Sequence, residues 1–429
     1  MDDAQIQRML QTAVQERRAG RSDAAARLFR DVVAQGEYPL ALNALGLHAL
    51  TQAQFDEATT FFTRAIAADP AAPELWMNLA RARREQGDAA GEAAALDGAL
   101  ALDQRHFMAL VRMAELRERQ GDAAGAAERW RGVLAMEPSI DERSPALELM
   151  FDHARNFVQQ QSAAFGTTID RGLAAVRDTI PAADRRRADA CIDHALGRRS
   201  IYANVCAGMH FPFLPADEYF ARDHFPWLAE IEAKTDLIRA ELEAILAADA
   251  QAIRPYVAMP AGTPQNKWSA LDHSLQWGAL HLWKDGRRDA AACARAPQTA
   301  AIIEALPLSD LPGRTPTVFF SLLQPGAHLP AHTGVSNVRA IVHLPLIVPP
   351  GCSFRVGGET RDWREGEAWV FDDTIEHEAW NRSDEMRAIL IFDVWNPYIS
   401  ATERELLRRF YAVAADTDGA PQSAFDISD

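Results

Sequence analysis

Small and large apolar residues recur with a step of 34 positions in the first third of the chain. Four columns keep one register over three successive units. They are Gly46, Ala80 and Ala114; Phe62, Leu96 and Trp130; Ala65, Ala99 and Val133; and Pro70, Gln104 and Pro138. This period predicts stacked helix–turn–helix units, because small residues let two helices cross closely and large residues fill the gap to the next unit.

Turn signals support these units. Gln86-Gly87-Asp88 and Gln120-Gly121-Asp122 lie between the two helical stretches of their units. The pattern resembles the tetratricopeptide repeat over residues 38–140, with a weaker, degenerate unit around residues 20–33. Such arrays leave an extended concave face, so we expect a groove that binds a peptide or protein. A spacer or a dimerisation element is the alternative.

The middle of the chain, residues 141–250, is helical in pattern. Leu149, Phe151 and Phe157 form an apolar stripe, and residues 235–247 have clean helical spacing. Residues 211–227 are rich in aromatic residues and proline, so we expect an irregular, packed segment there.

The hydrophobic period changes from 3.6 to 2 at about Arg314. Short β-rich runs follow at Thr317–Leu323, Arg339–Leu346, Ser353–Val356, Glu367–Phe371 and Ala388–Val394. Short strands separated by proline and glycine predict an antiparallel barrel or a jelly roll of the cupin type.

Length and composition narrow the function classes. The 429 residues predict two or three domains, and the net charge of −16 argues against a general nucleic-acid binder. The first residues lack the features of a signal peptide, and no apolar run is long enough to span a bilayer. We therefore expect a cytoplasmic protein without a membrane segment. The four scattered cysteines have no metal-binding spacing and receive no role.

Candidate chemistry concentrates in the β-rich part. His332 follows a turn, His377 follows a strand, and Arg387 opens the next strand ten positions later. Two histidines on separate rims of a small barrel can bind one metal ion and leave coordination positions open. An arginine that points into an apolar barrel needs an anion, and a carboxylate matches its geometry.

Several motifs in this order resemble the aspartyl/asparaginyl β-hydroxylase family of 2-oxoglutarate dioxygenases. The resemblance covers residues 210–398 and rests on His332-Thr333-Gly334, Val342-His343-Leu344, Phe371-Asp372-Asp373, Glu376-His377-Glu378 and Asp393-Val394-Trp395. It implies a double-stranded β-helix fold and Fe(II), 2-oxoglutarate and O₂ as cofactor and co-substrates.

The resemblance also implies residue roles. His332 and His377 would bind iron, Arg387 would bind the distal carboxylate of 2-oxoglutarate, and Ser321 and His343 would help to bind this co-substrate. Gly334 occupies the position at which most dioxygenases carry a third, carboxylate ligand. The resemblance implies that this family departs from that triad, with only two protein ligands on the iron and water in the place of the third.

The implied substrate is an aspartate, asparagine or other side chain of a peptide or protein recruited by the repeats. The family carries a substrate-binding arginine two residues before the co-substrate histidine, but this chain has Ile341 there. Arg339 lies two residues further back on the same strand face and could reach the substrate. The alternative is that Arg339 is solvated and the pocket is less polar than in the family.

We expect the other polar and aromatic residues near these candidates to have structural roles. Asp372 and Asp373 could bind the adjacent loop or orient a histidine. Trp268, Trp277 and Trp283 are expected to pack the outer layer of the domain, although one could line the pocket. His328 is expected to belong to a turn.

Competing functions remain open. A halogenase could place chloride beside Gly334, a zinc cupin could use the histidines without a 2-oxo acid, and a scaffold could carry a vestigial barrel. The predicted domains are repeats at 1–140, a helical linker at 141–205, a dioxygenase domain at 206–400, and a helix and tail at 401–429.

Overall fold

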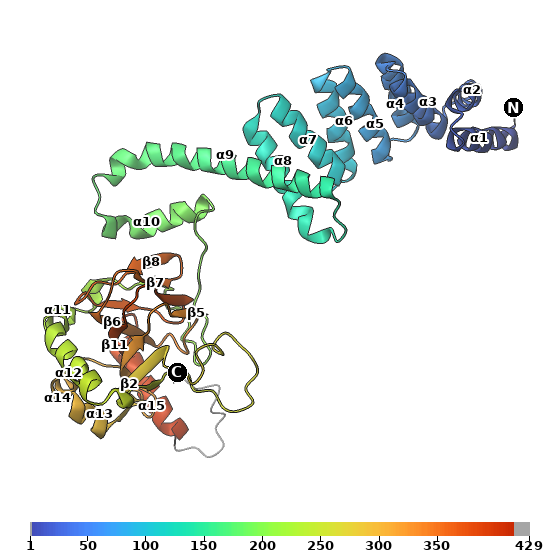
Figure 1. Ribbon diagram of the computed structural model, residues 1–429. Coiled ribbons are helices and arrows are strands. Elements are labelled where there is room, and N and C mark those ends of the chain that lie inside the picture. Colours follow the sequence, from blue (N-terminus) through green and yellow to red (C-terminus); the bar gives the residue numbers. More distant parts are fainter. Residues whose placement is uncertain (1, 416–429) are drawn as a thin grey trace. The chain divides into compact units, whose positions relative to one another are not determined.

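Paired helices make up the first part of the chain. The computed structural model describes residues 2–415, and its internal contacts divide the chain between Asp189 and Ala190. In the N-terminal unit, consecutive helices pack in pairs that follow one another along the array (Figure 1). The helices are α1 (Asp3–Arg18), α2 (Ser22–Val33), α3 (Pro39–Thr51), α4 (Phe55–Ala68), α5 (Pro73–Glu85), α6 (Ala89–Leu102), α7 (Phe107–Arg119), α8 (Ala123–Met136) and α9 (Pro145–Arg177).

Local chemistry explains the helix boundaries in the repeats. Gly87 and Gly121 both follow a helix with φ of +74°, a conformation that glycine adopts without steric cost. Asp88 and Asp122 cap the next helices, because each side chain accepts a hydrogen bond from a backbone N–H three residues later. Between helices, Gly46 lies so close to the ring of Phe62 that a Cβ atom would come within 2.5 Å of it.

The long helix α9 corrects one detail of the predicted stripe. Phe151 is buried and packs beside Trp130 and Val133 of the last repeat, whereas Leu149 is 70% exposed. The stripe therefore contains Phe151 and the partly buried Phe157 but excludes Leu149. Helix α10 (Ala182–Ala195) follows α9.

The C-terminal unit contains two antiparallel sheets. The seven-stranded sheet has the order β1-β2-β4-β11-β6-β9, with β3 paired to β2, and the four-stranded sheet has the order β5-β10-β7-β8. The strands are β1 (Arg254–Pro255), β2 (Trp277–Lys284), β3 (Arg287–Arg288), β4 (Val318–Leu323), β5 (His328–His332), β6 (Arg339–Ile347), β7 (Cys352–Val356), β8 (Glu359–Asp362), β9 (Trp369–Phe371), β10 (His377–Asn381) and β11 (Arg387–Trp395). The prediction of a helical repeat region followed by a β-rich domain is confirmed.

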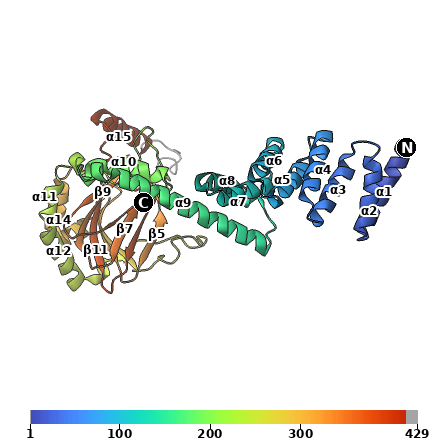
Figure 2. The same cartoon turned by 90° about the horizontal axis from the view of Figure 1, so that it is seen from above.

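The larger sheet is covered on both faces. One face packs against α11 (Leu228–Glu232), α12 (Thr235–Ala248), α13 (Ala290–Arg295) and α14 (Pro297–Glu304). Three of them, α11, α12 and α14, lie together along one side of the sheets (Figure 2). The other face shares a hydrophobic cluster with the smaller sheet, in which Leu323 and Ile389 of the larger sheet meet Phe354 and Ala379 of the smaller one. The candidate site lies in this space between the sheets.

The period-2 pattern at Arg314 predicted too late a start for the strands, because β1, β2 and β3 precede it. Strand β2 is buried on both faces and so lacks the alternation of a half-buried strand. Strand β5 was also missed, since it contains Pro330; it forms an edge strand, where proline is tolerated.

The expectations for residues 211–227 and for the C-terminal end have separate outcomes. Residues 211–227 are largely irregular, with Tyr219 and Phe225 buried but Phe213 fully exposed. Helix α15 spans Ala401–Ala415, and the tail predicted after it lies outside the described residues. Within residues 2–415 we find no helix of the length and hydrophobicity that crossing a membrane requires. The cytoplasmic location stays a prediction.

Candidate active site

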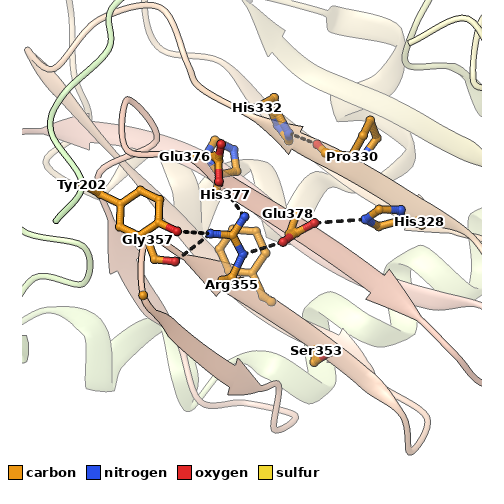
Figure 3. Close-up of polar contacts among 12 residues, drawn as sticks. Tyr202, His328, Pro330, His332, Ser353, Arg355, Gly357, Glu376, His377 and Glu378 are labelled. Atoms are coloured by element: carbon orange, nitrogen blue, oxygen red, sulfur yellow. Dashed lines mark hydrogen bonds and ion pairs between the residues drawn. The ribbon is translucent and has the colours of Figure 1, made fainter. Parts of the chain in front are cut away.

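Two histidines face each other at the rim of the smaller sheet. His332 ends β5 and His377 begins β10, and the two residues are direct partners in the antiparallel ladder. Their ring centroids are 4.0 Å apart, and Figure 3 shows them side by side. His332 was expected directly after a turn; it closes strand β5 instead, because β5 had not been predicted.

Backbone carbonyls fix the tautomers of both rings. His332 Nδ1 lies 2.7 Å from the Pro330 oxygen, and His377 Nδ1 lies 3.0 Å from the Ile375 oxygen. Because a carbonyl can only accept, each Nδ1 carries a proton, and a neutral ring then has its lone pair on Nε2. Burial lowers the pKa of His377 to about 4, so this ring is neutral at physiological pH. Neutral imidazoles held by backbone acceptors suit metal binding.

A carboxylate fills the space beside Gly334. A Cβ atom added to Gly334 would lie 2.2 Å from Asp373 Oδ2, and Gly334 N–H donates to the Asp373 backbone oxygen at 2.6 Å. Among residues 2–415, no group of three or more His, Cys, Asp or Glu side chains is arranged to hold a metal ion. His332 and His377 are the two candidate metal ligands that the sequence singled out.

Arg387 is buried in the same cavity without a carboxylate partner among the described residues. Burial lowers its pKa to about 10, which still leaves the guanidinium charged at neutral pH. Its Cζ atom lies 4.8 Å from the ring centroid of Trp363.

Three buried nitrogen atoms around Arg387 are unsatisfied. Arg387 Nε, Trp363 Nε1 and His343 Nδ1 have no hydrogen-bond partner within residues 2–415. Burial, followed by the positive charge of Arg387, lowers the pKa of His343 well below its usual value. Buried polar groups are nearly always paired in folded proteins, so this cluster fits an anionic ligand.

Ser321 lies next to Arg387 on β4. Trp277 Nε1 donates to Ser321 Oγ at 3.0 Å, and Arg387 Nη1 makes long contacts of 3.4 Å with the oxygens of Ser321. Trp277 lines the cavity and so confirms the alternative that one of the three tryptophans lines the pocket. The expectation of packing in the outer layer holds for Trp283, which packs in the cluster under the helices.

Arg339 is completely buried and paired. Its Nη1 donates to Asp393 Oδ2 at 3.1 Å, and its Nη2 lies 3.4 Å from Asp373 Oδ2. The interpretation of Arg339 as a solvated residue is therefore wrong. Asp373 binds this arginine, whereas Asp372 accepts hydrogen bonds from Thr374 and Asn204.

One cavity of about 530 Å³ connects these residues. It is lined by the candidate residues His332, His377, Arg387, Ser321, His343 and Arg339. The structure thus brings together all six residues that the sequence singled out.

Sequence reasoning missed several lining residues. Trp363 and Asp393 received no role of their own. Trp268 is a second tryptophan in the lining, and its ring lies in a T-shaped contact with the His332 ring, with centroids 4.8 Å apart. The alternation along β11 could have indicated Asp393, since it shares a strand face with Arg387. We find no comparable signal for Trp363, which follows β8 in a loop.

The face of the smaller sheet that points away from the cavity carries an ion-pair network. Arg355 contacts Glu376 and Glu378, and Glu378 also contacts His328 (Figure 3). His328 stacks on Trp380 with ring centroids 5.3 Å apart. It opens β5 and does not belong to a turn, so the turn prediction for His328 is wrong.

Comparisons with known proteins agree with both parts of the chain. Residues 232–397 match the model of the family described as Aspartyl/Asparaginyl beta-hydroxylase, and residues 10–73 and 43–106 match a tetratricopeptide repeat model. An aspartyl/asparaginyl beta-hydroxylase of Mus musculus is 40% identical over 133 residues, which are 30% of this chain and 18% of that protein. An ornithine lipid ester-linked acyl 2-hydroxylase of Rhizobium tropici is 35% identical over 176 residues, 40% of this chain and 58% of that protein.

The chain therefore spans less than a fifth of the mouse relative and just over half of the rhizobial one. Among solved structures, the MamA RS-1 ArsTM double mutant is 20% identical and covers 33% of this chain and 80% of its own, with a TM-score of 0.31. This score is too low to bear on the fold.

Proposed function

Residues 232–397 form an aspartyl/asparaginyl β-hydroxylase domain that follows tetratricopeptide repeats, and on this premise we propose that the chain is an Fe(II)- and 2-oxoglutarate-dependent hydroxylase. Its substrate is a C–H bond in a side chain of a peptide or protein recruited by the repeats. The observation that carries the proposal is the cluster of unsatisfied buried nitrogen atoms at Arg387, Trp363 and His343, in the same cavity as two paired histidines.

His332 and His377 would hold the iron. Their fixed tautomers leave Nε2 as the lone-pair nitrogen of each ring, and two protein ligands leave positions for other ligands. When bound, Fe(II) supplies the coupling of O₂ reduction and 2-oxoglutarate decarboxylation, giving succinate and CO₂, to insertion of one oxygen atom into the C–H bond.

Arg387 would bind the distal carboxylate of 2-oxoglutarate. A guanidinium presents two parallel N–H donors to a carboxylate, and the ligand would neutralise a buried charge. Ser321 and His343 line the same part of the cavity and would contact the co-substrate. Trp363 Nε1 adds a donor that lacks a partner within the described residues.

The two packed antiparallel sheets would form the double-stranded β-helix, a cupin-like jelly roll. The arrangement supports this assignment, because the shared cluster joins both inner faces around the candidate site.

The names of the relatives support hydroxylation more than any one substrate. One name refers to aspartyl or asparaginyl residues and the other to an acyl group of a lipid. The tetratricopeptide repeats favour a peptide or protein substrate for this chain, because such arrays offer an extended binding surface.

The halogenase alternative would place chloride beside Gly334. Asp373 Oδ2 occupies the space next to this glycine, and a carboxylate there repels a second anion. We therefore favour hydroxylation over halogenation.

The test is succinate formation from 2-oxoglutarate by the full chain with Fe(II), ascorbate and air. We expect succinate from the wild type and none above background from His377→Ala. If wild type makes no succinate and binds no 2-oxoglutarate without oxygen, the proposal fails. The scaffold alternative, with a vestigial barrel, then becomes the working hypothesis.

A further inference from the structure

The cavity contains two buried arginines at opposite ends of one sheet face. Arg387 begins β11, and Arg339 pairs with Asp393 near the other end of that strand. Arg387 and Asp393 are six residues apart on β11, which corresponds to about 20 Å at the rise of a β-strand. A five-carbon dicarboxylate bound at Arg387 therefore cannot also reach Arg339. We call the region around Arg339, Asp373 and Asp393 the far end of the cavity.

Charge differs between the two ends. Arg387 has no carboxylate partner among the described residues, whereas Arg339 contacts both Asp373 and Asp393. The far end therefore carries one positive and two negative formal charges. The remaining cation of the cavity lining, Lys284, is exposed and directly precedes Asp285 in the chain.

A substrate carboxylate at the far end would meet a net negative charge. The guanidinium that could bind it already donates to Asp393 and lies beside the Asp373 carboxylate. Displacing either aspartate would leave a buried carboxylate without its partner, which costs more than the new contact gains. An anionic group is therefore rejected, and specificity arises from this repulsion.

The surface between the two ends combines aromatic and aliphatic side chains with two histidines, His281 and His343, which are the outer partners of Phe319 and Ile391. Phe319 and Ile391 are cross-strand partners on β4 and β11, and Ile341 of β6 pairs with Asp393. Tyr256 and Trp268 line the cavity from the segment around β1 and the loop after it. Burial of an aliphatic group against the aromatic and aliphatic side chains of these walls is favourable, because it removes apolar surface from water.

We propose that the far end of the cavity selects an uncharged, aliphatic side chain of a peptide as the group to be hydroxylated, and rejects the aspartate side chain. The inference rests on the proposed function and narrows its substrate class. It assigns Asp393 and Asp373 to specificity, because they compensate the one buried arginine that could otherwise bind a carboxylate.

The test uses three matched probes with the full chain, Fe(II) and N-oxalylglycine under argon. The probes are the N-acetyl α-amides of leucine, asparagine and aspartate, and binding is read from the tryptophan fluorescence to which Trp268 and Trp277 contribute. We expect the leucine probe to bind about tenfold or more tightly than the aspartate probe, with asparagine between them. Since asparagine matches aspartate in size, this order separates charge from shape.

The variant Asp393→Asn tests whether the negative charge at the far end causes the rejection of aspartate. Asp393 Oδ1 accepts the Thr317 N–H at 2.6 Å, and an asparagine oxygen can keep this contact while one negative charge is lost. We expect this variant to bind the aspartate probe about tenfold more tightly than wild type does. The comparison of probes on wild type needs no variant and stands even if Asp393→Asn does not fold.

Each outcome has a defined meaning. If N-oxalylglycine itself does not bind, the proposed function fails. If it binds but the aspartate probe equals or exceeds the leucine probe, the present inference alone fails. In air with 2-oxoglutarate, oxygenation of octanamide but not of the leucine probe would assign the site to acyl chains and overturn the side-chain assignment.

Discussion

His332 and His377 are 45 positions apart in the chain, yet they are direct partners in the ladder between β5 and β10, with ring centroids 4.0 Å apart. The backbone hydrogen bonds of a sheet therefore set the separation of the two rings. A carbonyl two residues before each histidine fixes its rotation as well. A site built on strand ends is organised before any ligand arrives, so its metal affinity should depend on both rings.

We predict that His332→Ala and His377→Ala each abolish tight binding of Fe(II). Loss of one of two protein ligands leaves a single imidazole, which cannot hold the ion against water. The measurement is the iron content of the full chain after anaerobic loading and gel filtration.

His328→Ala is the matched control. His328 stands on the opposite face of the same sheet, stacked on Trp380, and should leave the iron content unchanged. Equal iron content in His377→Ala and wild type would contradict the assignment of the metal site.

A second prediction concerns Arg387→Gln. Replacing this arginine should weaken 2-oxoglutarate binding by roughly 10- to 100-fold, because a charge-assisted pair with a carboxylate is lost. The same change should raise the melting temperature of the ligand-free chain, since it removes a buried charge that has no carboxylate partner within residues 2–415. Calorimetric titration and a thermal melt measure the two effects.

Arg382→Gln provides the control for loss of a positive charge. Arg382 is exposed and lies over the ring of Trp380, outside the cavity. A variant Arg387→Gln that bound 2-oxoglutarate like wild type would remove Arg387 from the co-substrate site.

The repeat architecture was predictable because it depends on a local period. Gly46, Phe62 and their counterparts 34 positions later each contact near neighbours, so the pattern alone identifies the packing. Likewise, period-2 spacing predicted that Arg339 shares a strand face with Ile341, and both line the cavity.

Contacts between distant strands were not predictable from one sequence. The solvated interpretation of Arg339 failed because Asp393 lies 54 positions away and meets it through the register of β6 and β11. The same holds for Trp277 and Ser321, which are joined through β2 and β4. Register between strands depends on the whole sheet, so local patterns cannot reveal such pairs.

A third prediction tests the packing of the repeats. In Gly46→Ala the new methyl group would come within 2.5 Å of the Phe62 ring, so the two helices must move apart. Overpacking costs about 1–3 kcal/mol, and the better helix propensity of alanine offsets up to about 1 kcal/mol. We expect a net loss of about 1–2 kcal/mol, measured by urea unfolding followed by circular dichroism.

Gly132→Ala is the control in α8. There a Cβ atom would lie 3.9 Å from the Leu110 side chain, an ordinary contact, so helix propensity alone should act and the variant should be slightly more stable than wild type. Equal stability changes in the two variants would argue against close packing at Gly46.

The last prediction concerns pH and the fully buried Asp372. Burial raises the pKa of this carboxyl from 3.8 to about 6, although hydrogen bonds from Thr374 and Asn204 act in the opposite direction. Because the folded pKa is the higher one, the folded state binds the proton more tightly than the unfolded state. The contribution of this group to stability is thus largest below pH 3.8 and is lost as pH rises through about 6.

Wild type should therefore lose about 2 kcal/mol of unfolding free energy relative to Asp372→Asn between about pH 4.5 and about pH 8. Subtracting the variant removes the effect of the other carboxylates, which titrate in both proteins. Asp384→Asn, at an exposed aspartate, controls for the change in net charge. The opposite sign, with wild type gaining stability as pH rises, would mean that the bonds from Thr374 and Asn204 outweigh burial and hold Asp372 ionised.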